Sequence, residues 1–174
     1  MAEEKKVLVG IVMGSDSDWG KIKGAVAPLN DFHIPYEVHV MSAHRTPEKV
    51  LEYAQTAKDR GIQVIIAAAG GAAHLAGVIA SHTTLPVIGI PVQTDFLGGL
   101  DSLLSTVQMP GDIPVATVGV GSGGARNAGL LAVQILALAD NNLAEALVKF
   151  KKSLVEKIEK KDHDLQFMIG NSQE

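Results

Sequence analysis

The stretch Val7-Leu8-Val9-Gly10-Ile11-Val12-Met13 is apolar almost without interruption, and the polar turn Gly14-Ser15-Asp16-Ser17-Asp18 follows it directly. A strand that is apolar at every position is buried on both faces, which is typical of a parallel sheet covered by helices. Residues 19–29 then carry apolar side chains at helical spacing, and we expect Pro28 to kink or fray that helix late. This strand, turn and helix predict an α/β fold.

The same unit recurs along the chain. We expect further strands at 36–41, 64–69, 87–90 and 115–118, and further helices at 46–60, 74–81, 99–107 and 125–140. Short buried strands that alternate with helices predict one doubly wound, three-layer parallel sheet of flavodoxin-like order. We therefore treat residues 1–174 as a single α/β domain with a core at 6–140 and a C-terminal helix and tail at 141–174.

Composition restricts the classes of function. The chain has 174 residues, 47% of them hydrophobic, a formal net charge of −4 and no cysteine. The negative charge argues against nucleic-acid and anionic-membrane partners, and the lack of cysteine excludes disulfides and thiol catalysis. Neither a signal-peptide pattern nor an apolar run of transmembrane length is present, so we expect a cytoplasmic protein.

The C-terminal part of the chain predicts self-association. Residues 125–140 are apolar all round, whereas a helix in the outer layer of this fold needs only one apolar face. Another subunit is the simplest cover, so we expect a homo-oligomer. Residues 143–158 predict a further amphipathic helix, and we expect the tail after Asp162 to be loosely ordered.

Three loops at strand ends concentrate the polar and small residues. They are Gly14–Asp18, Ser42–Pro47 and Gly70–His74. Because parallel strands place their carboxyl ends at one edge of the sheet, we expect these loops to form one crevice.

The second loop, Ser42-Ala43-His44-Arg45-Thr46-Pro47, carries the strongest chemical signal. The imidazole of His44 suits proton transfer near neutral pH, although a lone histidine more often fills a structural role. The planar guanidinium of Arg45 suits a phosphate or carboxylate, although an ion pair with Asp16 or Glu48 is the plainer interpretation.

The other two loops supply candidate ligand contacts. Ser15 and Ser17 can donate to a phosphate or simply cap a helix, while Asp18 can accept from sugar hydroxyls or cap the same helix. Gly70 and Gly71 allow a flat ring or a small carboxylate to approach closely, or allow close helix packing. We also place Ser42, Ala43 and His74 among the candidate substrate contacts, with His74 balanced between a site and a structural role.

Three other motifs carry less weight. Gly119, Gly121 and Gly124 match the dinucleotide pattern G-x-G-x-x-G, but no later strand offers an acid for the ribose, so tight helix packing is the simpler explanation. No serine has the glycine spacing of a nucleophile elbow. No histidine pair has helical metal-ligand spacing, so we expect no metal site.

Four ordered motifs together resemble the PurE family, the N5-carboxyaminoimidazole ribonucleotide mutases of de novo purine synthesis. The resemblance covers about residues 7–141 and rests on Val12-Met13-Gly14-Ser15-Asp16-Ser17-Asp18-Trp19, Ser42-Ala43-His44-Arg45-Thr46-Pro47, Ala69-Gly70-Gly71-Ala72-Ala73-His74-Leu75, and Asp101-Ser102-Leu103-Leu104-Ser105 through Gln108-Met109-Pro110.

The resemblance implies a shift of a carboxylate from an exocyclic nitrogen to imidazole C4 without metal, ATP or other cofactor. It implies that Ser15 and Arg45 bind the substrate phosphate, that Asp18 binds ribose hydroxyls, and that His44 is the general acid and base. It also implies a homo-octamer.

Two alternatives remain. A sister class carboxylates aminoimidazole ribonucleotide directly with carbon dioxide, but it usually carries Lys-Gly where this chain has Arg45-Thr46. The second alternative is a protein without enzymatic activity, either a flavodoxin-like receiver domain or a flavin-binding module. A receiver needs an aspartate after the third strand, where this chain has Ala69-Gly70-Gly71, and two aspartates in the first loop fit poorly with a flavin phosphate.

Overall fold

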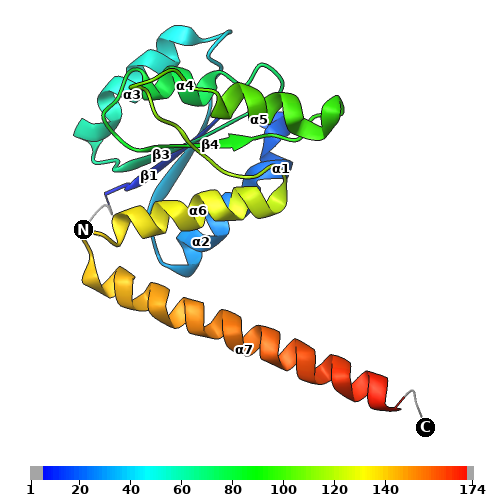
Figure 1. The fold of residues 1–174 in the computed structure, drawn as a ribbon. Coiled ribbons are helices and arrows are strands. Elements are labelled where there is room, and N and C mark those ends of the chain that lie inside the picture. The colour runs from blue at the N-terminus through cyan, green and yellow to red at the C-terminus, as the bar shows by residue number, and fades with distance from the viewer. Residues whose placement is uncertain (1–5, 172–174) are drawn as a thin grey trace. The chain divides into compact units, whose positions relative to one another are not determined.

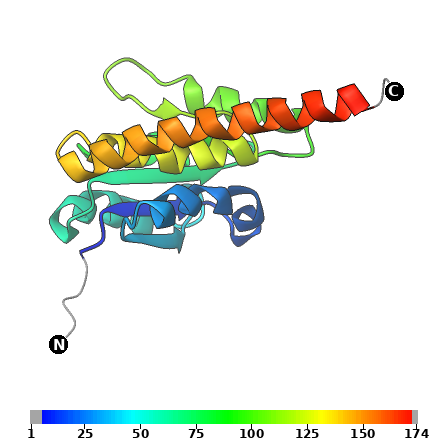
Figure 2. The ribbon, with the colours of Figure 1, turned by 90° about the horizontal axis from the view of Figure 1, so that it is seen from below.

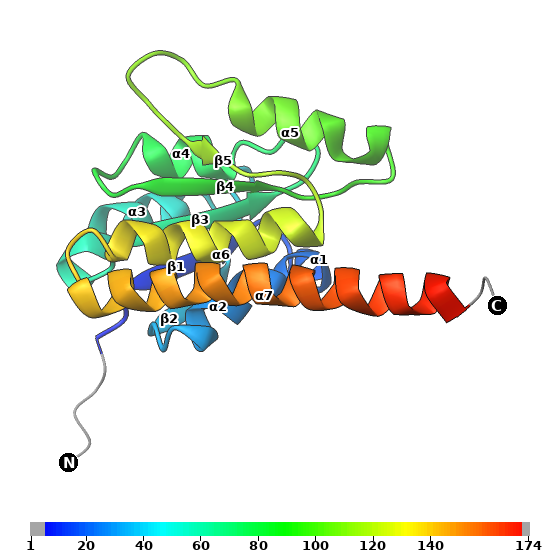
Figure 3. The ribbon, with the colours of Figure 1, turned by 60° about the horizontal axis from the view of Figure 1, so that its bottom comes forward.

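Five parallel strands form one sheet in the order β2-β1-β3-β4-β5 in this computed structural model, which describes residues 6–171. Figure 1 shows the fold, and Figure 3 labels all five strands. The predicted flavodoxin-like order is therefore confirmed. The strands are β1 (Val9–Met13), β2 (Tyr36–Val40), β3 (Val64–Ala69), β4 (Val87–Pro91) and β5 (Ala116–Thr117).

Helices cover both faces of the sheet, which gives the predicted three layers (Figures 1 and 3). One face carries α1 (Trp19–Ile22), α2 (Val26–Asp31) and α6 (Ser122–Leu136). The other face carries α3 (Pro47–Arg60), α4 (Leu75–Ala80) and α5 (Leu100–Val107). Three short 3₁₀ segments complete this part of the chain: η1 (Asp16–Asp18), η2 (Lys23–Ala25) and η3 (Leu97–Gly99).

Strand register brings the three polar loops together. Met13, the last residue of β1, pairs with Val40 on one side and Ala68 on the other. All five residues of β1 are buried, as a strand between two covered faces must be. The loops that follow β1, β2 and β3 consequently begin at nearly the same level.

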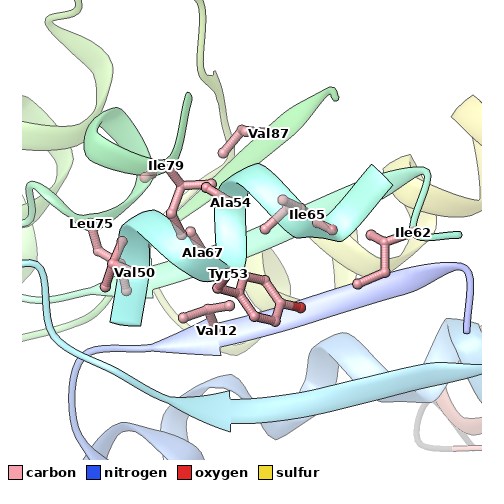
Figure 4. Close-up of a cluster of buried hydrophobic side chains, with 12 residues drawn as sticks. Val12, Val50, Tyr53, Ala54, Ile62, Ile65, Ala67, Leu75, Ile79 and Val87 are labelled. Carbon is pink, nitrogen blue, oxygen red and sulfur yellow. The ribbon is translucent and has the colours of Figure 1, made fainter. Parts of the chain in front are cut away.

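The core between the sheet and the α3–α4 layer is built mainly from aliphatic side chains, with Tyr53 as its one large aromatic residue (Figure 4). Tyr53 packs over β1, and a Cβ atom added at Gly10 would overlap its hydroxyl oxygen. Gly10 therefore leaves the space that the Tyr53 ring occupies. At the end of α3, Gly61 adopts φ +100° and stops the helix as predicted.

Two predicted elements differ in the structure. The helix expected over residues 19–29 is divided into α1, η2 and α2, so the interruption comes before Pro28 and not after it. A proline ring collides with the carbonyl four residues earlier, which here belongs to Gly24 inside η2. The last strand, β5, has only two residues instead of the four expected, and the last bond to β4 runs from the Val118 amide to the Gly89 carbonyl at 3.1 Å.

Small residues let α6 approach its neighbours closely. A Cβ at Gly124 would overlap the carbonyl oxygen of Gly119, and one at Gly129 would overlap that of Ala25. Of the glycines that match a dinucleotide pattern, Gly124 therefore lies at a close packing contact, while Gly121 takes φ +88° just before α6.

The described residues form two compact units, one ending at Leu136 and the other beginning at Ala137. The second unit consists mainly of α7 (Asn141–Asn171), a single unbroken helix in Figure 2. The expectation of a loosely ordered tail after Asp162 is therefore wrong as far as Asn171: residues 162–169 contain no helix-breaking residue, so the helix continues. None of the described helices is both long and apolar enough to span a membrane.

Candidate active site

A cavity of about 550 Å³ lies at the carboxyl ends of the central strands. This volume suits a ligand of nucleotide size. The residues that line it come from four loops and the start of α4: Gly14, Ser15, Asp18, Ser42, Ala43, His44, Arg45, Ala69, Gly70, Gly71, Ala72, Leu75 and Thr94. Eight of the ten predicted site residues therefore line one cavity, and the other two, Ser17 and His74, contact residues of its wall.

Ser42 and Thr46 fix the shape of the loop that carries His44. The Ser42 hydroxyl accepts hydrogen bonds from the amides of His44 (3.4 Å) and Arg45 (3.2 Å). Thr46 Oγ1 accepts from the Ser42 amide at 2.9 Å and lies 3.2 Å from the Ser42 carbonyl oxygen. The loop is thus held by its own side chains before Pro47 starts α3, and Thr46 stabilises the loop without bonding to an amide of the helix.

His44 is paired with the second histidine of the site. Its Nε2 atom lies 2.9 Å from Nδ1 of His74, and the two rings meet edge to face with centroids 5.0 Å apart. One nitrogen of the pair must donate and the other accept, so the tautomer of one ring fixes that of the other. The pairing makes His74 part of the site, although its ring does not line the cavity.

The guanidinium of Arg45 reaches the first loop. Its Nη2 atom donates to the carbonyl of Gly14 at 2.7 Å. Within residues 6–171, no carboxylate lies within 4.0 Å of the guanidinium, so the ion-pair interpretation with Asp16 or Glu48 is wrong. One bond to a backbone carbonyl orients the fork and leaves further N–H groups for an anion.

The first loop presents two hydroxyls and a carboxylate. Ser15 caps η1 by accepting from the Ser17 amide at 3.3 Å, and the two serine hydroxyl oxygens lie 2.8 Å apart. The pKa of Asp18 is raised, mainly by burial, against the lowering effects of Lys21, the Ser15 backbone and Arg45. Burial of a carboxylate at a cavity wall is unfavourable on its own, and hydroxyl donors from a ligand would offset that cost.

The glycine loop forms the opposite wall, and α5 holds it. The amide of Gly71, a residue at φ +67°, donates to Ser102 Oγ at 2.9 Å, and its carbonyl oxygen lies 3.0 Å from Ser105 Oγ. The wall continues with Thr94, whose Oγ1 atom lies 2.9 Å from Asp101 Oδ1. Thr94, Ser102 and Ser105 are not among the site residues predicted from the sequence, because their contacts to the loops connect segments more than 20 residues apart or depend on a side-chain rotamer.

Together these groups can perform a defined kind of chemistry. A paired imidazole can give and accept a proton, Arg45 with Ser15 can hold an anionic group, and Asp18 can accept hydroxyl hydrogen bonds. No cluster of three or more histidine or carboxylate side chains that could hold a metal ion occurs among residues 6–171. The site fits a small anionic ligand with hydroxyl groups.

Comparison with known proteins agrees with this geometry. A family model described as AIR carboxylase matches residues 8–157. A protein of Bacillus subtilis named N5-carboxyaminoimidazole ribonucleotide mutase is 61% identical over 80% of this chain and 86% of its own length. A protein of Mycobacterium leprae with the same name is 58% identical over 93% of this chain and 94% of its own length.

Solved structures agree as well. The crystal structure of Treponema denticola PurE superimposes with a TM-score of 0.81 and 32% identity, covering 91% of this chain and 98% of that protein. The family match, the sequence relatives and the fold thus point the same way: this chain belongs to the AIR carboxylase family.

Proposed function

We propose that this chain converts N5-carboxyaminoimidazole ribonucleotide to 4-carboxyaminoimidazole ribonucleotide, as a mutase of de novo purine synthesis. The observation that carries the proposal is the convergence of His44, Arg45, Ser15 and Asp18 on one cavity in a chain 61% identical to a protein named for this activity. The products and substrates differ only in the position of one carboxylate.

The substrate binds through its phosphate and ribose. Arg45 and Ser15 lie on neighbouring loops and bind the phosphate, while Asp18 accepts from the ribose hydroxyls. Ser17, 2.8 Å from Ser15, orients the Ser15 hydroxyl for the same role. The aminoimidazole ring then extends toward Ala43, Gly70 and Gly71, where small residues leave room for a flat ring.

His44 moves one proton out and one proton back. Protonated His44 donates to the carbamate nitrogen; the nitrogen–carbon bond breaks, its electron pair stays on nitrogen, and carbon dioxide forms. Ring atom C4 attacks the carbon of carbon dioxide and forms the new carbon–carbon bond. His44 then takes the proton from C4, which restores both the aromatic ring and the protonated imidazole.

His74 supports this exchange through its 2.9 Å contact with His44. Nε2 of His44 faces His74, so the proton that His44 exchanges with the substrate is the one on Nδ1. With Nδ1 of His74 accepting from Nε2–H, the pair keeps His44 oriented both before and after Nδ1 gives up its proton. No metal or organic cofactor enters these steps.

The sequence next to His44 favours the mutase over direct carboxylation. Arg45-Thr46 stands where the carboxylase class usually has Lys-Gly, and Thr46 bonds to Ser42 in a way that glycine cannot. The relatives described above share the mutase name.

We further propose that the protein works in the cytoplasm, as the family resemblance implies. We also propose that it forms a homo-octamer, which the same resemblance implies and which exposed apolar side chains in both units support. On the first unit they cluster in η3 and α5 and the residue before them: Phe96, Leu97, Leu100, Leu104 and Val107. On α7 they include Val148, Val155, Ile158 and Phe167. Apolar surface of this extent is typical of an interface between subunits.

Product formation from each candidate substrate tests the proposal. The protein is mixed with N5-carboxyaminoimidazole ribonucleotide, or with aminoimidazole ribonucleotide and bicarbonate at physiological concentration. We expect rapid formation of 4-carboxyaminoimidazole ribonucleotide only in the first mixture. Turnover of the second mixture alone would show a direct carboxylase, and turnover of neither would contradict both enzyme functions.

A further inference from the structure

The glycine wall of the cavity is attached to α5 by two hydroxyl groups. Ser102 Oγ accepts from the Gly71 amide at 2.9 Å, and Ser105 Oγ lies 3.0 Å from the Gly71 carbonyl oxygen. The serines are three residues apart, so they lie on the same face of the helix. The Gly71 amide is therefore bonded to α5 through Ser102, while the Gly71 carbonyl oxygen, which also accepts from the Ala73 amide at 2.9 Å, lies within reach of Ser105 on the same helix.

Both serines are shielded from solvent, unlike most hydroxyls at a protein surface. Ser102 is completely buried and Ser105 is partly buried. Ser105 Oγ also lies 2.6 Å from the carbonyl oxygen of Asp101, so its single hydrogen is shared between the Asp101 and Gly71 carbonyls. The bond from the Gly71 amide to the buried Ser102 hydroxyl favours one arrangement of the loop, because breaking it leaves that amide unpaired.

The same turn of α5 reaches a second part of the cavity wall. Asp101 Oδ1 lies 2.9 Å from the hydroxyl of Thr94, which lines the cavity on the loop after β4. The first turns of α5 thus join the glycine loop and the Thr94 loop. None of these α5 residues lines the cavity itself.

We propose that Ser102 and Ser105 are positioning residues that hold the Gly70–Gly71 wall closed while carbon dioxide is free in the site. The inference rests on the proposed mutase function, in which carbon dioxide exists between the two bond changes. The phosphate and ribose contacts lie on the loops after β1 and β2, away from this wall. Loosening the wall should consequently spare substrate binding and let carbon dioxide escape, which leaves free aminoimidazole ribonucleotide.

The test measures how each turnover ends. Ser102→Ala, Ser105→Ala and the double variant are given N5-carboxyaminoimidazole ribonucleotide, and both the carboxylated product and the released aminoimidazole ribonucleotide are quantified against an enzyme-free blank. We expect kcat to fall about tenfold, KM to stay within about twofold, and the ratio of released to carboxylated product to rise about fivefold, from the loss of buried hydrogen bonds.

Thr106→Val is the matched control. Thr106 is also a buried hydroxyl on α5, but its Oγ1 atom donates to the Ser102 carbonyl at 2.7 Å and touches neither wall loop. It should lose stability and keep the wild-type product ratio. Ser105→Thr keeps the hydroxyl and should also retain that ratio.

Each outcome decides the inference. An unchanged ratio in all serine variants, or an equal rise in Thr106→Val, would overturn it. If Ser102→Ala does not fold, the partly exposed Ser105 still allows the comparison of alanine with threonine. Absence of turnover by the unaltered chain would instead overturn the mutase function, and this inference with it.

Discussion

His44 and Arg45 are adjacent in the chain, yet the structure gives their side chains different surroundings. His44 contacts another imidazole at 2.9 Å, whereas Arg45 bonds to the Gly14 carbonyl at 2.7 Å. These surroundings fit the roles proposed for the two residues, proton exchange at His44 and anion binding at Arg45. The sequence pattern indicated both roles, but it could not show that His74, 30 residues away, completes the first.

Replacing His44 by asparagine removes the proton carrier and keeps a polar side chain of similar reach. We expect kcat to fall by about 10²–10⁴, the usual contribution of general acid–base catalysis. Binding of the product, measured by calorimetry, should stay within a few-fold of wild type. His82→Asn, at an exposed histidine outside the site, serves as the control. Near-normal kcat in the His44 variant would assign proton transfer to another group.

Replacing Arg45 by alanine removes the charged part of the phosphate site. We expect the KM to rise about 10- to 100-fold, in line with the loss of hydrogen bonds to a charged group. Lys58→Ala removes an exposed cation from α3 and should leave KM unchanged, which separates a direct contact from a change in net charge. An equal effect of both substitutions would argue against a specific clamp.

At the scale of elements, the sheet and its order follow from the apolar pattern, because strands buried on both faces have a strong sequence signature. The finer geometry does not. The interruption before Pro28 depends on a clash with the Gly24 carbonyl, and the short β5 depends on where the chain leaves the sheet. The hydroxyls of Ser102 and Ser105 reach Gly71 only once α5 has packed against the sheet. No local sequence pattern predicts that contact, because it joins residues more than 30 positions apart.

The edge strand β2 is fastened to α3 by an ion pair. Arg60 Nη1 donates to Glu37 Oε1 at 2.7 Å, and the guanidinium also stacks 4.8 Å from the centre of the Tyr53 ring. Burial tends to raise the pKa of Glu37, but Arg60, Tyr53 and His39 outweigh it, so the pKa is lowered from 4.5. A lowered carboxyl pKa contributes stability above the unfolded-state value, and that stability is lost as pH falls through the folded-state value.

Arg60→Met keeps the aliphatic stem and removes the charge. We expect the free energy of unfolding at pH 7 to fall by about 1 kcal/mol, a modest value because the pair is partly exposed, and to change much less at pH 3. Urea unfolding at the two pH values measures the difference. Lys58→Met, on the same helix, should show no such dependence; a loss for Arg60→Met that is equal at both pH values would point to packing alone.

At the scale of the whole molecule, η3 and α5 in the first unit and α7 in the second each carry exposed apolar side chains, which the proposed octamer would cover. Leu104, for example, is 50% exposed on α5, the helix that carries Ser102 and Ser105. If neighbouring subunits cover this surface, α5 contributes to the subunit interface and also holds the glycine wall of the cavity. The sequence indicated self-association through the apolar residues 125–140, but the exposed patch on α5 emerged only from the structure.

Leu104→Glu places a charge in that exposed patch. We expect sedimentation velocity to show eight associated chains for the unaltered protein and smaller species for the variant, because a buried unpaired charge is costly. Gln63→Glu introduces the same charge at an exposed polar position and should leave the assembly intact. An unchanged distribution for Leu104→Glu would place the interface elsewhere.

In the proposed reaction, one cavity moves a carboxylate between two atoms of the same substrate. The most direct test uses N5-carboxyaminoimidazole ribonucleotide with ¹³C in its carboxylate, turned over in a large excess of unlabelled bicarbonate. The account predicts that nearly all of the 4-carboxyaminoimidazole ribonucleotide carries ¹³C when it is analysed by mass spectrometry. If the product instead carries ¹³C only in proportion to its share of the dissolved carbon dioxide and bicarbonate, carbon dioxide leaves the site during turnover. That result would contradict transfer within one cavity.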